Sequence, residues 1–155
     1  MPPSAQIVAR VLVSMFFSSL IVLSLGLTAT VLADVSMTVL QWFGLSTILV
    51  LGGLPFCLLG LALGLTVKSD SAPAIVNLIY LPMSFLSGLW IPISMLPSFL
   101  QSLAQWLPPY HLAQLALKVT GQDQGGAVST HIGVLLLFAT LFFALALLAY
   151  KQKAN

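Results

Sequence analysis

The chain has 155 residues, of which 59% are hydrophobic and only 5% are charged, and its formal net charge is +2. A soluble domain carries about 25% charged residues, so this composition excludes a water-soluble surface and indicates an integral membrane protein. The net charge is small and no basic cluster is present, which argues against nucleic-acid binding.

Four segments are apolar and long enough to cross a hydrocarbon core of about 30 Å, which takes roughly 20 helical residues. None contains a charged side chain, and in lipid the backbone must satisfy its own hydrogen bonds, so we expect four helices. They form one all-α transmembrane domain over residues 1–155, with spans at about 11–32, 42–67, 74–91 and 131–150. The first run exceeds the roughly 7–15 apolar residues of a signal peptide and is interpreted as a retained span.

The connection between the third and fourth predicted spans has a pattern of its own. Apolar residues recur at helical spacing, with Ser and Gln on the opposite face, which predicts an amphipathic helix over residues 96–107. Pro97 suits the start of that helix, and Pro108–Pro109 is expected to end it. A second short helix is predicted over residues 110–118. The two make a helical hairpin outside the bundle of spans.

The cations predict the orientation. With the N-terminus in the cytoplasm, four of the five Lys and Arg residues face inside and only Lys118 faces outside, which is a clear positive-inside bias. Both termini are therefore expected to be cytoplasmic, and the hairpin extracellular. The four inner cations are Arg10, Lys68, Lys151 and Lys153.

Proline and glycine residues mark candidate positions for gating and packing. Pro82 removes a helix hydrogen bond inside the third span, so the span is expected to kink there, either as packing geometry or as a hinge. Gly60 and Gly64 form a G-x-x-x-G pair, which permits close helix approach within the chain or at a homodimer seam. The structural or gating candidates are Pro82, Gly88, Pro92, Pro97, Pro108 and Pro109.

No pattern indicates an enzyme or an ion-coupled carrier. Such carriers usually keep a charged residue or His inside a span, and no His, Cys, Asp or Glu pair has metal-ligand spacing. His111 and His131 are interpreted as interfacial polar residues. The stretch GLALGLTVKS lacks the glycine before lysine that a phosphate-binding loop needs. We therefore expect no cofactor in this chain, and any transport energy has to come from a partner.

The run LGLALGLTVKSDSAPAIVNLIYLPMSFLSGLWIPISMLPSFLQSLAQWLPPYHLAQLAL closely resembles the C-terminal half of ABC type-2 (ABC-2) transporter permeases. The combination of LPMSFLSGLWIP with MLPSFLQSLAQWLPP carries the resemblance. It implies the last four of six spans, with extracellular helices that partly re-enter the membrane. It also implies an exporter of the inner (plasma) membrane that works by alternating access. Such permeases form homodimers or heterodimers in the lipid bilayer, powered by ATP on separate cytoplasmic ATPase subunits.

The resembled family carries further segments before the matched region: an amphipathic helix, two spans and a coupling segment that touches the ATPase. We therefore expect a truncated form or a fragment. The alternative is a non-transporting four-helix membrane scaffold or assembly protein, which explains the uncharged spans but not the hairpin.

Overall fold

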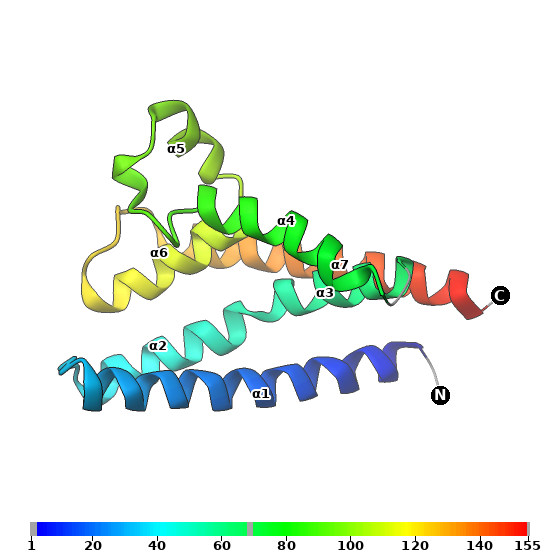
Figure 1. Ribbon diagram of the computed structural model, residues 1–155, viewed down its shortest axis with the longest axis horizontal. Helices are drawn as coiled ribbons and strands as arrows, with labels where there is room; N and C mark the ends of the chain where they lie inside the picture. The colour runs from blue at the N-terminus through cyan, green and yellow to red at the C-terminus, as the bar shows by residue number, and fades with distance from the viewer. Residues whose placement is uncertain (1–2, 68–69, 155) are drawn as a thin grey trace.

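Long apolar helices run alongside one another through most of the molecule (Figure 1). The computed structural model describes residues 3–67 and 70–154, and the secondary structure within those residues is entirely helical. This confirms the predicted all-α class. In chain order the elements are α1 (Pro3–Leu32), α2 (Val39–Gly52), α3 (Leu54–Thr66), α4 (Ala72–Leu86), the 3-10 helix η1 (Ile93–Met95), α5 (Ser98–Ala104), α6 (Pro108–Thr120) and α7 (Val128–Ala154).

Three helical stretches within the described residues are long and apolar enough to cross a membrane: Ser4–Leu32, Val39–Thr66 and Val128–Gln152. Their large apolar side chains are widely exposed; Leu32 keeps 81% of its surface accessible. Exposed apolar area on this scale is unfavourable in water and favourable against lipid. The helices therefore have the surface of a multi-pass membrane protein.

The second predicted span, residues 42–67, consists of two helices. Pro55 lies at the start of α3, has no N–H for a continuous helix ladder and would place its ring against the preceding turn. Gly53 accommodates the break: its N–H donates to the carbonyl of Leu49 at 3.1 Å, and its own carbonyl accepts from the first turn of α3. α2 and α3 together still make one apolar stretch of 28 residues.

The third predicted span is shorter than expected. The helix α4 has 15 residues and ends at Leu86, whereas the prediction continued to residue 91. The cause is Gly88, whose φ of +81° reverses the chain and directs it into η1. Pro82 lies inside α4 as predicted, on an exposed face.

The two helices predicted after the third span differ in their bounds. α5 covers only Ser98–Ala104 of the predicted 96–107, and Pro97 caps its start as expected. Pro108–Pro109 does not end a helix, which corrects the prediction: the two prolines are the first residues of α6. A missing N–H has no cost in the first turn, and the fixed φ of proline already suits a helix there.

Two clusters of buried apolar side chains hold the helices together. The first joins α1, α3 and α7, where α3 runs along α7 and the fully buried Ala146 allows close approach. The second joins η1, α5 and the start of α6. The buried members of the first are Ile7, Leu58, Ala62 and Ala146, and those of the second are Ile93, Leu96, Ala104 and Tyr110.

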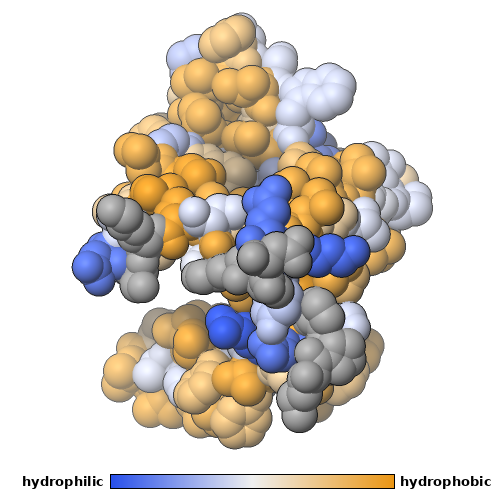
Figure 2. Space-filling view, turned by 90° about the vertical axis from the view of Figure 1, so that its right-hand side faces the viewer, coloured by the Kyte–Doolittle hydropathy of each residue, from blue (hydrophilic) through white to orange (hydrophobic). Residues whose placement is uncertain are grey.

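The start of α1 and the end of α7 lie at one end of the molecule, opposite α5 and α6 (Figure 1). Figure 2 faces the end with the chain termini and shows hydrophilic residues gathered between hydrophobic flanks. Arg10 and Lys151 belong to the terminal parts of α1 and α7, whereas Lys118 lies on α6. Lys68 and the side chain of Lys153 lie outside the described residues.

Gly88→Ala is expected to lower the free energy of unfolding. A Cβ at this position would lie 3.2 Å from the Cβ of Ile93, and a left-handed φ costs an L-residue roughly 1–2 kcal/mol. Thermal unfolding of the detergent-solubilised protein measures the effect.

Two glycine variants control this measurement. Gly121 has a left-handed φ of +69°, but a Cβ there would meet open space. Gly121→Ala should therefore lower the free energy of unfolding by less than Gly88→Ala does. Gly133→Ala, in α7, has open space and no left-handed φ, and its melting temperature should not fall. A Gly88→Ala variant that melts with the wild type would contradict the argument.

Candidate functional site

The residues between α4 and α6, here named the connecting segment (residues 87–107), form a structured unit. The indole N–H of Trp90 donates to the hydroxyl of Ser84 at 3.1 Å and ties the segment back to α4. The side-chain amide of Gln101 donates to the carbonyl of Leu96 at 2.7 Å and closes the turn before α5. The first bond holds the start of the segment to α4, and the second, together with the segment's own apolar cluster, stabilises its interior.

The structure brings most of the predicted gating residues into or beside this segment. Gly88 reverses the chain at its start, Pro92 caps η1 and Pro97 caps α5. Pro108 and Pro109 are less than 2% exposed and follow the segment at the start of α6. Pro82, in α4, lies before the segment.

Gly60 and Gly64 are not part of this site. A Cβ built at either position meets no atom within 4 Å, so the pair makes no close helix contact within the described chain. Both predicted roles of the pair, packing within the chain and a homodimer seam, stay predictions. The glycines leave this part of α3 open.

The connecting segment presents aromatic and apolar side chains outward. Trp106 is 78% exposed, Phe99 73% and Trp90 68%. Aromatic side chains are enriched where membrane meets water, because a ring can lie among lipid chains while its polar edge reaches the headgroups. This surface suits a membrane boundary.

Beneath the segment, α6 and α7 bring two buried histidines together. The Nδ1 atoms of His111 and His131 are 2.8 Å apart, and the side chains are 5% and 4% exposed. The Nε2 of His111 lies 2.9 Å from the carbonyl oxygen of Gln105, and that of His131 lies 3.4 Å from the carbonyl oxygen of Gly125. The pair therefore links the connecting segment, α6 and the start of α7.

Tyr110 packs edge-on against both imidazole rings, with centroid distances of 5.3 Å to His111 and 6.2 Å to His131. Burial raises the pKa of the Tyr110 hydroxyl. Burial also lowers the pKa of His111, an effect opposed by its bond to the Gln105 carbonyl and reinforced by the neighbouring His131. The surroundings of His111 therefore favour its neutral form.

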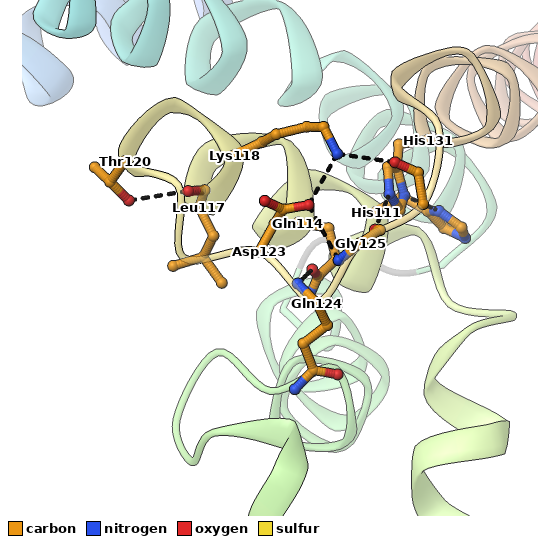
Figure 3. A network of polar contacts seen from close by, with 10 residues as sticks. His111, Gln114, Leu117, Lys118, Thr120, Asp123, Gln124, Gly125 and His131 are labelled. Carbon is orange, nitrogen blue, oxygen red and sulfur yellow. Dashed lines mark hydrogen bonds and ion pairs between the residues drawn. The ribbon is translucent and has the colours of Figure 1, made fainter.

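A second polar network fastens the loop between α6 and α7 (Figure 3). The Nζ of Lys118 donates to the Oδ2 of Asp123 and to the carbonyl of Gly126, each at 2.8 Å. The side-chain carbonyl of Gln114 accepts from the backbone N–H of Gln124 at 2.8 Å. The ammonium of Lys118 lowers the pKa of the Asp123 carboxyl, chiefly through their hydrogen bond. The loop is thus held to α6 by charged and neutral bonds.

Across residues 3–67 and 70–154, no group of three or more His, Cys, Asp or Glu side chains converges as a metal site. An apolar groove of about 680 Å³ lies between α1 and α2, lined by residues such as Val22, Trp42 and Val50. The mostly apolar lining of this groove suits contact with the hydrocarbon chains of lipid.

Sequence reasoning missed the pairing of the two histidines, because their 20-residue separation follows no helical or hairpin period. Only the path of α6 and its return into α7 brings them together. The bond between Lys118 and Asp123 had a local signal. A helix closed by Gly121 returns the following loop toward the last helical turn, where a basic side chain meets it.

The chain matches the family described as "ABC-2 family transporter protein" over residues 1–148. It belongs to the ABC-2 transporter family. This confirms the resemblance of the sequence, and membership indicates a transporter membrane component rather than an enzyme.

Two curated relatives support this ABC-2 assignment. The chain is 30% identical over 131 residues to "Putative transport permease YvfS" of Bacillus subtilis (strain 168), a match that covers 83% of this chain and 52% of that protein. It is 40% identical over 65 residues to "Nodulation protein J" of Sinorhizobium fredii (strain NBRC 101917 / NGR234), covering 42% of this chain and 25% of that protein. The match thus spans about half the length of the first relative. No solved structure matches the chain significantly.

Asp123→Asn in this ABC-2 chain is expected to lower the melting temperature at pH 7. The pKa of Asp123 is lower in the folded chain than in the unfolded chain, where it is about 3.9. The ionised carboxylate therefore stabilises the fold fully above the unfolded pKa, and this stabilisation is lost as the pH falls through the folded pKa. The melting difference from wild type should therefore shrink at acid pH. Melting curves of both proteins from pH 7 to pH 3 measure it.

The control is Asp34→Asn, at an exposed loop carboxylate in the left-handed conformation that Asn also tolerates. It should melt with the wild type at pH 7. If the melting temperature of Asp123→Asn stayed below that of the wild type by the same amount down to pH 3, the ion pair would not be the cause of the difference.

Proposed function

We propose that this chain is part of the permease of an ATP-binding-cassette exporter, moving substrate across the membrane by alternating access. A separate cytoplasmic ATPase supplies the energy, and the connecting segment acts as the outer gate. One observation carries the proposal: a compact helical unit with its own apolar cluster lies at the end of the long helices opposite the chain ends. A simple helical anchor has no need of such a unit.

The proposed orientation places both termini in the cytoplasm and the connecting segment outside an inner (plasma) membrane. Arg10 and Lys151, near the chain ends, then face inside, while Lys118 on α6 faces outside. In this orientation α4 makes a fourth crossing, together with the turn that follows it. Its 15 residues form about 22 Å of helix at 1.5 Å per residue, short of a core of about 30 Å. The exposed aromatic residues of the connecting segment then lie at the outer boundary.

We propose two kinds of protein partner. The ATPase binds ATP and docks on the cytoplasmic end, so this chain needs no cofactor of its own. A second permease chain, identical or different, packs in the membrane, and the open glycine face at Gly60 and Gly64 permits close approach of its helix.

Co-expression with an ABC ATPase subunit from the source genome tests the ATPase partnership. The full chain, tagged and extracted in mild detergent, should retain that ATPase at a fixed ratio through gel filtration. The complex should hydrolyse ATP, and mutation of the ATPase's phosphate-binding lysine should remove hydrolysis while leaving the complex intact. A full-length permease that never associates with an ATPase would overturn the proposal.

The alternative function, a non-transporting four-helix scaffold, predicts a different response to changes in the gate. Pro108→Ala with Pro109→Ala keeps the helical start of α6 but removes two buried rings beneath the connecting segment. An exporter should lose most of its efflux, at least tenfold, while reaching the membrane at the wild-type level.

The matched control is Pro97→Ala, at an exposed proline that starts α5. It should retain most of the efflux. Cellular efflux assays and membrane immunoblots measure both variants. Unchanged efflux in the double variant favours the scaffold.

A further inference from the structure

The hydrogen-bond partners of the two histidines determine where their protons lie. A carbonyl oxygen only accepts, so the Nε2 of His111, 2.9 Å from the carbonyl of Gln105, carries a proton. In the neutral ring the Nδ1 of His111 is then an acceptor. The Nδ1 of His131, 2.8 Å away, must donate to it.

This arrangement depends on the number of protons in the pair. In the neutral pair, the Nε2 of His131 has no proton and faces the carbonyl of Gly125 at 3.4 Å without a bond. One added proton on that atom lets every ring nitrogen take part in a hydrogen bond. A second added proton sets two N–H groups against each other at the 2.8 Å contact, which a hydrogen bond cannot bridge.

We propose that the His111–His131 pair is a proton-dependent latch, closed while the rings share one Nδ1 proton and released when both rings are protonated. Because His111 also holds the carbonyl of Gln105, release frees the connecting segment from α7. The latch stands on its own geometry. Its position at the outer face, where it senses the pH outside the membrane, rests on the proposed function.

The surroundings of the pair allow this response. Tyr110 packs edge-on against both rings, and the nearby charged groups, Lys118 of α6 and Asp123 of the following loop, are already bonded to each other. α2, η1 and α5 carry no titratable side chain, and Tyr80 of α4 packs edge-on against Phe56 instead. Burial lowers the pKa of His111, so His111 takes up the second proton only in an acidic medium.

A metal site is the competing explanation for two buried histidines. Within the described chain, no third His, Cys, Asp or Glu completes a cluster around them. The Nδ1 atoms at 2.8 Å are also closer than two nitrogens that share a zinc ion, each about 2.0–2.1 Å from the metal in tetrahedral geometry. Direct proton sharing accounts for the distance.

Spin-label distance measurements on the full chain in lipid nanodiscs test the latch without any transport assay. One label replaces Ser102 in α5 and the other Ser129 at the start of α7, both exposed, in a Cys57→Ser background that removes the native cysteine. At pH 7.5 the distance distribution should be narrow. Toward pH 5 it should broaden to longer distances, with a midpoint at or below about 6.5.

The decisive variant is His131→Asn. Its side-chain amide can donate to the Nδ1 of neutral His111, and it can turn its carbonyl oxygen to accept from that nitrogen once it is protonated. No two N–H groups are then opposed, so the distribution should stay narrow at both pH values. Tyr110→Phe and Asp123→Asn are the controls, because neither removes a latch nitrogen, and both should keep the wild-type response.

Four results would overturn the latch. The wild-type distances could remain unchanged between pH 7.5 and pH 5. The shift could persist in His131→Asn, or it could disappear in Asp123→Asn. A pH response abolished by EDTA and restored by zinc would equally overturn it in favour of a metal site. Loss of ATPase binding or efflux, by contrast, bears only on the proposed function.

Discussion

Backbone hydrogen bonding in a medium without water is the constraint on which the rest of this structure depends. A span in hydrocarbon must satisfy every N–H and C=O within itself, which leaves the helix as the available form for isolated segments. The apolar stretches from Ser4 to Leu32 and from Val128 to Gln152 obey this rule without interruption. Polar chemistry is consequently displaced to the helix ends and connections.

The helix α6 collects much of that displaced chemistry. It contributes buried His111 and Gln114, and its last turn contributes Lys118, so it bonds both to the connecting segment and to the loop before α7. A buried polar group that loses its hydrogen-bond partner costs free energy, so these bonds fix the position of α6. A change at this helix is therefore transmitted to the segment above it and to α7 together.

Proline and glycine residues illustrate how far local rules extend. Pro97 begins α5, as its fixed φ predicts, but the same chemistry admits two opposite readings of Pro108–Pro109. A proline pair can follow a helix or begin one, and burial of both rings under the connecting segment selects the second. Gly88 was predicted to lie inside the third span, yet its left-handed φ ends α4 early, and a Cβ there would lie only 3.2 Å from the Cβ of Ile93.

The sequence by itself determined the helical class, the membrane environment and the approximate place of the long helices, because these depend on composition and local periodicity. Its motifs, such as LPMSFLSGLWIP, also carried the resemblance to the ABC-2 family. Only the tertiary structure decided that Gly60 and Gly64 face open space and that His111 meets His131. Those features depend on which helices lie beside one another. In uncharged spans, where nearly every face is apolar, no residue pattern distinguishes a face turned toward lipid from one turned toward a neighbouring helix.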